Sequence, residues 1–166
     1  MTRCDAGLRK GFWKGVGFGL TSGVITTLGI VVGLHSGTQS KLAVLVGIVV
    51  IAIADALSDA TGIHISEEAE NEHSTKEIWE SSLFTFSSKL FIALSFLIPV
   101  MLLDSITSIF ASIGWGLFLI SIFSFSMARS QEQSPWKVIG EHVLIVILVV
   151  ILAHILGDLI HESLLS

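Results

Sequence analysis

Five apolar runs, each long enough to cross a lipid bilayer, make up most of this chain and decide what it can fold into. A helix needs about 20 mainly apolar residues to span the hydrocarbon core of a bilayer. The runs cover residues 15–34, 42–65, 81–103, 109–127 and 136–160, with ends good to a few residues. Only 14% of the chain is charged, against about 25% in a soluble domain. The sequence therefore predicts an all-α membrane protein, a single domain of five transmembrane helices.

The distribution of basic residues predicts which way these helices run. With a cytoplasmic N-terminus, five spans place every Lys and Arg except Lys41 inside the cytoplasm or close to it. Short cytoplasmic loops of multi-pass proteins are enriched in Lys and Arg. We therefore expect a cytoplasmic N-terminus, a C-terminus outside, and a short acidic cytoplasmic segment at residues 67–80. A prokaryotic plasma membrane is the expected location.

Several function classes lack support in the sequence. The chain has no His-Glu-x-x-His, Walker A or Gly-x-Ser-x-Gly pattern, so we expect no enzyme. Its basic residues are few and scattered, which argues against a nucleic-acid partner. Cys4 is the only cysteine, so no disulfide framework exists.

One stretch joins an apolar span to a run of carboxylates. On a single helix at about 100° per residue, six polar side chains of this stretch fall within an arc of roughly 60°. They are Asp55, Asp59, Ser66, Glu70, His73 and Glu77. An ionisable side chain within a span is costly in lipid and is by default a functional hypothesis. Carboxylates with an occasional imidazole suit hard or borderline divalent cations.

These residues predict a path for a metal ion. The expected metal ligands are Asp55, Asp59, Glu67, Glu70, His73 and Glu77. For residues 67–77 the alternative is an ordinary solvated helix surface. Lys89, about two turns into the third span, is expected to snorkel to the interface or to pair with a carboxylate.

The first span carries glycine at every fourth position in two series. The first series is Gly11, Gly15, Gly19 and Gly23, and the second is Gly29, Gly33 and Gly37. Small residues at this spacing let two helices approach closely in lipid. The partner helix belongs either to a second copy, giving a homodimer through the first span, or to the same chain. Ser22 and Thr26 in this span are candidate path-lining residues, as is Glu141, which equally suits a helix N-terminus.

The last span ends in a second polar group, whose spacing places all its members on one helix face. It consists of His154, Asp158, His161 and Glu162. These residues are a candidate outer metal site. The alternative, which we favour, is a polar final turn that reaches the headgroups. Elsewhere, Pro99 is expected to kink the third span, and Ser134 followed by Pro135 is expected to start the fifth.

Two of these stretches resemble signatures of the vacuolar iron transporter family. Gly23-Val-Ile-Thr-Thr-Leu is similar to that family's Asp-Gly-Leu-Val-Thr-Thr. The stretch from Ala54 to Ser66 is similar to its Ala-Gly-Ala-Leu-Ser-Met-Ala-x-Gly-Glu-Tyr-x-Ser. Ile98-Pro99, Gly140-Glu141 and Leu156-Gly157 add to the likeness, which covers all five spans. The resemblance implies a five-helix protomer, a homodimer with the path between its two first spans, and proton-coupled export of Fe²⁺ or Mn²⁺ from the cytoplasm.

The chain departs from the family pattern at the residues that matter for metal binding. The family's metal-binding aspartate in span one corresponds to Ser22, its span-two methionine to Asp59 and its glutamate to Ile63. Residues 67–80 stand where larger relatives have a long metal-binding hairpin. Replacing a thioether by a carboxylate favours harder ions such as manganese, magnesium or calcium.

The leading hypothesis is a divalent-cation exporter. The acidic segment would concentrate the ion through Glu67, Glu68, Glu70, Glu72 and His73. Asp59 and Asp55 would carry it through the membrane, with neutral oxygens from Ser22 and Thr26. No permanently bound cofactor is expected; the metal is cargo.

The alternative is a non-transporting membrane module that binds metal or a protein partner. The position of Asp59 separates the two. If Asp59 packs against Lys89 within one protomer, away from any aqueous path, pairing explains it and transport weakens. A carrier for a small organic solute is a third hypothesis, which the narrow glycine-packed helices do not favour.

Overall fold

The computed structural model describes residues 3–70 and 73–165, with side-chain surroundings described from residue 13 to residue 163. Within these ranges the chain is helical throughout apart from short connections. The helices are α1 (Arg3–Thr38), α2 (Lys41–Glu70), α3 (Thr75–Ser95), α4 (Leu97–Leu102), α5 (Ser105–Ser130) and α6 (Pro135–Leu165). Because α3 and α4 form one span, the described chain holds five helices long and apolar enough to cross a membrane. The predicted all-α class with five candidate spans is confirmed at this level.

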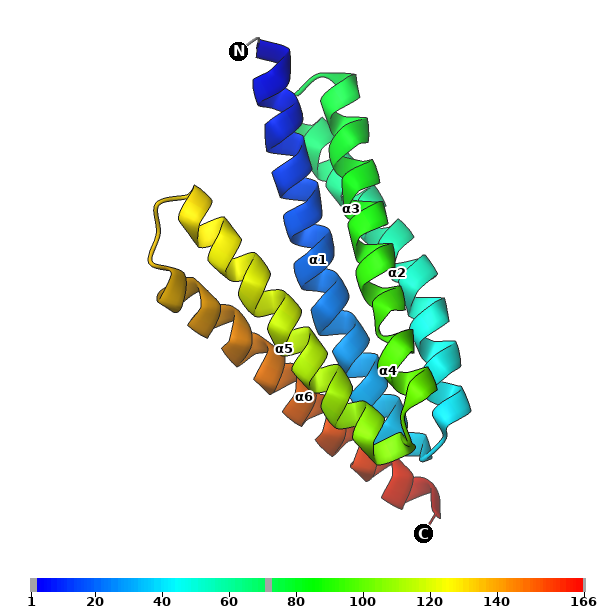
Figure 1. Ribbon diagram of the computed structural model, residues 1–166. Coiled ribbons are helices and arrows are strands. Elements are labelled where there is room, and N and C mark those ends of the chain that lie inside the picture. Colours follow the sequence, from blue (N-terminus) through cyan, green and yellow to red (C-terminus); the bar gives the residue numbers. More distant parts are fainter. Residues whose placement is uncertain (1–2, 71–72, 166) are drawn as a thin grey trace.

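Helix α1 is the centre of the bundle. It packs against α2 and α3 on one side and against α5 and α6 on the other, and the two groups diverge toward the end where the chain begins (Figure 1). The N-terminus and the α2–α3 and α5–α6 connections lie at this end, which we call the N-terminal end. The C-terminus lies at the opposite end with the α1–α2 and α4–α5 connections. The side of the membrane that each end faces remains a prediction.

The acidic segment, residues 67–80, is divided between two helices. Glu67 and Glu70 belong to the last turns of α2, and α3 begins already at Thr75. A capping box forces this early start, because the Ser74 side chain accepts from the Glu77 backbone N–H while the Glu77 carboxylate accepts from the Ser74 backbone N–H at 2.9 Å. The prediction of one polar stripe on a single helix from Asp55 to Glu77 is therefore wrong, since α2 ends at Glu70.

The glycines of α1 are used inside one chain. A Cβ placed at Gly19 would lie 2.5 Å from the Thr85 carbonyl oxygen of α3. The second series faces α6, where a Cβ at Gly157 would lie 2.7 Å from the Gly33 carbonyl oxygen and 3.0 Å from the Gly37 nitrogen. Small residues thus let α1 approach α3 with its first half and α6 with its second. A homodimer through the first span remains a prediction, and this glycine spacing no longer supports it.

The two local predictions about proline are confirmed. The third span breaks at Phe96, between α3 and α4, because Pro99 has no N–H to continue the ladder to Ser95. Beyond the break, Lys41 Nζ donates to the Leu103 carbonyl oxygen at 2.8 Å and so covers an unpaired end of the helix. The last helix begins at Pro135 as expected.

Candidate functional site

Four polar side chains meet midway along three of the candidate spans, where α1, α2 and α3 pack together. They are Ser22 of α1, Asp55 and Asp59 of α2 and Lys89 of α3. At 1.5 Å per residue, Asp55 and Lys89 each lie about 21 Å along their helices from the first residue. The candidate spans containing them have 30 and 28 residues, so this mid-span cluster lies far from both helix ends.

The mid-span cluster is centred on the Lys89 ammonium. Lys89 Nζ forms ion pairs with Oδ2 of Asp55 and Oδ2 of Asp59. It also donates to Ser22 Oγ at 2.8 Å, and Ser22 Oγ donates in turn to Asp59 Oδ2 at 2.7 Å. Of the three N–H groups of the ammonium, two donate to Ser22 Oγ and Asp59 Oδ2, while Asp55 Oδ2 is held by charge without a hydrogen bond. With ionised side chains the cluster carries a net charge of −1.

Burial is uneven across the mid-span cluster. The Lys89 side chain is 1% exposed, while Asp55 and Asp59 keep 22% and 18% of their side-chain surface exposed. Both carboxylates therefore reach the surface of the single chain. This decides the sequence-based test in part: Asp59 does pair with Lys89 within one protomer, but neither carboxylate is sealed inside the protein.

The three predicted path-lining residues do not lie together in the structure. Ser22 joins the mid-span cluster, whereas the Thr26 hydroxyl donates back to the Ser22 carbonyl oxygen at 2.9 Å, which is a local helix bond. Glu141 is exposed on α6, and α6 packs against α1 and α5. Glu141 therefore belongs to a different side of α1 from Asp55.

A second group of charges forms at the N-terminal end. Lys14 Nζ of α1 forms an ion pair with Glu67 and lies 3.8 Å from Glu70 Oε1. His73 Nδ1 lies 3.0 Å from Glu67 Oε2 and 3.9 Å from Glu70 Oε2. Glu67 is nearly buried, with 4% of its side chain exposed. We call these four residues the end cluster.

In the described chain, one group of three residues has ligand atoms close enough to share an ion, all within 4.8 Å of one another. The group consists of Glu67, Glu70 and His73. Lys14 already supplies a positive charge there, so the geometry does not require a metal. Glu77 is turned to its capping role, Glu68 is exposed, and Glu72 lies outside the described residues.

The candidate outer site does not assemble as a four-residue site. His154 Nδ1 lies 2.6 Å from Ser36 Oγ, and its Nε2 lies 3.4 Å from Asp158 Oδ2. His161 turns instead to the Gly37 carbonyl oxygen, 3.0 Å from its Nδ1. Glu162 is exposed. One helix face places the four side chains in a row, but different neighbours satisfy them.

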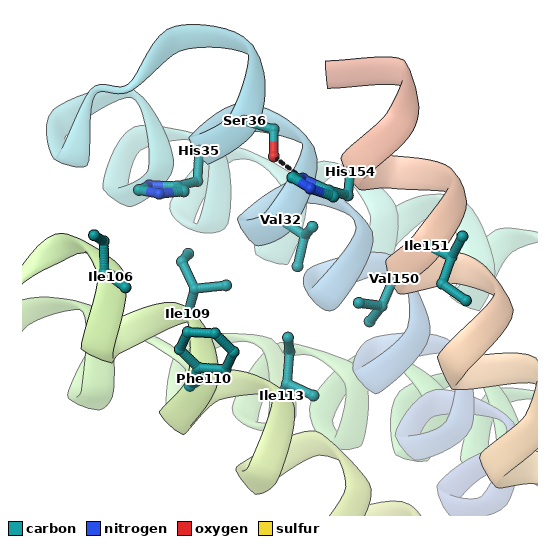
Figure 2. A pocket seen from close by; sticks show the side chains of 10 residues that line it. All are labelled: Val32, His35, Ser36, Ile106, Ile109, Phe110, Ile113, Val150, Ile151 and His154. Atoms are coloured by element: carbon teal, nitrogen blue, oxygen red, sulfur yellow. Dashed lines mark hydrogen bonds between the residues drawn. The ribbon is translucent and has the colours of Figure 1, made fainter. Parts of the chain in front are cut away.

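A cavity of about 290 Å³ lies beside His154, between α1, α5 and α6. Figure 2 shows the imidazoles of His35 and His154 at one edge, with the Ser36 hydroxyl bonded to His154 and apolar side chains around the remainder. The apolar walls are Val32, Ile106, Ile109, Phe110, Ile113, Val150 and Ile151. With so few polar groups, this cavity suits an apolar occupant better than an ion.

Sequence reasoning missed how completely Lys89 occupies the mid-span cluster. Pairing with a carboxylate was one of its two expected roles, but a bond to both carboxylates and Ser22 was not foreseen. The signal available was the presence of the one basic residue deep in an apolar span, at a depth similar to Asp55 and Asp59.

In comparisons with known proteins, no family and no curated sequence matches this chain.

Proposed function

We propose that this chain is a multi-pass transporter that moves a divalent cation, Fe²⁺ or Mn²⁺, out of the cytoplasm in exchange for protons. Asp55 and Asp59 bind the ion midway, and Ser22 adds a neutral oxygen. The carrying observation is that two carboxylates at mid-span share one lysine and stay partly exposed. The resemblance to vacuolar iron transporters supports the choice of ion, the export direction and a prokaryotic plasma membrane.

The surplus negative charge argues for a role beyond holding the helices together. One lysine and one aspartate would make a neutral pair, which is the cheaper way to bury these groups in lipid. The second aspartate leaves the mid-span cluster at −1. A net charge in a low-dielectric region costs free energy unless a counter-charge neutralises it, and a bound cation would supply that counter-charge.

The end cluster supports an approach route at the N-terminal end. Glu67 lies on the same helix as Asp59, about 12 Å further along. Carboxylates near an entrance raise the local concentration of cations. Under this proposal Glu67, Glu70 and His73 receive the ion and Asp59 takes it next.

The direct test is ion flux across vesicles that contain the purified protein. Mn²⁺ and Fe²⁺ uptake under a pH gradient is compared between the wild type and the Asp55→Asn, Asp59→Asn double variant. We expect the double variant to lose at least nine-tenths of the flux. Asp104→Asn, a carboxylate change at the α4–α5 connection that keeps a capping side chain, is the control and should transport normally. Wild-type rates in the double variant would refute the proposal.

A second candidate function is a non-transporting module that binds metal or a protein partner at the end cluster. The ion pairs of Lys89 with Asp55 and Asp59 within one protomer favour it. Under this alternative the wild-type vesicles show no flux, and the double variant changes only the stability of the fold.

A further inference from the structure

We propose that Lys89 is a built-in competitor for the transported cation: its ammonium fills the position of the ion and has to leave before the ion binds. This inference rests on the proposed function, since it concerns the same oxygens. It adds that the site is closed by a residue of the chain itself.

The geometry around Nζ is that of a bound cation. Three oxygens on two helices point at one atom: Asp55 Oδ2, Asp59 Oδ2 and Ser22 Oγ. A lysine ammonium is a compact point charge without a fixed fork of donors. It gathers oxygens from separate directions, as a small metal ion does, and carboxylates with a neutral oxygen are usual ligands of hard divalent cations. Lys89 therefore keeps the ligand set assembled while no ion is bound.

Charge makes the two occupants mutually exclusive. With the ammonium in place the mid-span cluster carries −1, and with a divalent ion alone its two carboxylates are neutralised. With both present, a positive charge would face a doubly positive ion across a few ångströms of buried space, where electrostatic repulsion is strongly felt. Either the ammonium or the ion occupies the three oxygens.

The test is Mn²⁺ binding and thermal unfolding of the purified full-length protein in detergent. Lys89→Gln removes the competitor, so we expect a lower melting temperature without metal, recovery of that loss with Mn²⁺, and Mn²⁺ affinity at least tenfold tighter than wild type. Lys89→Arg keeps a permanent charge on the same oxygens, so Mn²⁺ should neither bind at this site nor raise its melting temperature. Lys41→Gln, which removes a lysine at the end of the bundle that holds the C-terminus, should bind Mn²⁺ like the wild type.

A further variant assigns the binding to the mid-span cluster. Asp59→Asn added to Lys89→Gln should abolish the tenfold gain, whereas a gain that persists would place the ion elsewhere and overturn the inference. It is also overturned if Lys89→Gln binds Mn²⁺ no tighter than wild type, if Mn²⁺ fails to restore its fold, or if Lys89→Arg binds like the wild type. Flux by wild-type vesicles without the tightening in Lys89→Gln refutes the competitor alone. Tight binding by Lys89→Gln with no wild-type flux refutes transport alone.

Discussion

The mid-span cluster and the end cluster are built to one plan in two different surroundings. In each, a lysine from another helix holds two acidic residues of α2: Lys89 with Asp55 and Asp59, and Lys14 with Glu67. Glu70 is the second acid of the end cluster, at 3.8 Å from Lys14. The lysines differ sharply, because Lys14 is 44% exposed and Lys89 1%.

This difference in exposure teaches what each lysine does. Lys14 is partly exposed and shares the buried Glu67 carboxylate with His73, whose Nδ1 lies 3.0 Å from Glu67 Oε2, so Glu67 keeps an imidazole beside it when Lys14 is lost. Among the described residues, Lys89 is the basic residue that pairs with Asp55 and Asp59. We therefore expect the loss of the lysine to matter more in the mid-span cluster than in the end cluster.

The sharpest way to break this comparison is to remove each lysine in turn. Lys89→Leu should destabilise the fold by about 3–5 kcal/mol, because it leaves two largely buried carboxylates without a positive charge beside them. Lys14→Leu should cost less, because the His73 imidazole still lies 3.0 Å from the buried Glu67 carboxylate and Glu70 is exposed enough to be solvated. Unfolding in detergent, followed by circular dichroism, measures both. Equal losses would show that the two clusters do not differ in dielectric surroundings.

A second prediction concerns the close approach of α1 and α3 that shields Lys89. Gly19→Val should destabilise by about 1–3 kcal/mol, because its Cβ would lie 2.5 Å from the Thr85 carbonyl oxygen and backbone cannot move aside cheaply. Gly140→Val is the matched control, since a Cβ there meets nothing within 4 Å. Melting temperatures compare the pair. A Gly19 variant as stable as the Gly140 variant would mean that α1 and α3 can separate without loss.

High salt should weaken the ion pairs of the two clusters to different extents, an effect smaller than the two above. Screening shortens from about 10 Å at 0.1 M to 3 Å at 1 M ionic strength and acts mainly on exposed charges. A double-mutant cycle for Lys14 and Glu67 should therefore lose part of its coupling at 1 M salt, whereas the cycle for Lys89 and Asp59 should keep its value. Parallel loss in both cycles would show that water reaches Lys89.

The weakest expected effect belongs to Asp104, a carboxylate outside both clusters. The Thr107 side-chain and backbone hydrogen bonds lower the pKa of Asp104 below its ordinary value of 3.8. The folded state thus favours the ionised form, so this contribution is present above that value and is lost as the pH falls through the lowered pKa. Asp104→Asn keeps a capping side chain and should remove only this acid-dependent part of the melting temperature. An unchanged acid profile would show that Asp104 does not contribute.

What could be read from the sequence was local, and what was missed depends on how helices pack. The spans, the break near Pro99 and the start at Pro135 follow from neighbouring residues alone. Asp55 and Asp59 share a face because of helical periodicity. The same periodicity gave a wrong prediction for Glu77. Its angular position was counted as if one helix ran from Asp55 to Glu77, whereas a connection separates α2 from α3.

The contacts of these residues with other helices could be found only from the three-dimensional structure. Glycine spacing in α1 indicates a close neighbour, yet nothing in it distinguishes α3 for the first half from α6 for the second. Similarly, the depth of Lys89 matches that of Asp59, but only packing brings Ser22 to the same ammonium. Lys14 beside Glu67 joins residues far apart in the chain, which no local pattern predicts.

The one-sided attachment of α6 to α1 has a mechanical consequence. The two helices approach closely at Gly157, about 33 Å along α6 from Pro135, while the opposite ends of α1 and the α5–α6 pair stand apart around a cavity of about 460 Å³ (Figure 1). With a fulcrum at Gly157, a rotation of about 5° carries Pro135 through about 3 Å. A tilt of a few degrees about Gly157 would therefore displace the α5–α6 connection much further than the C-terminal end of α6.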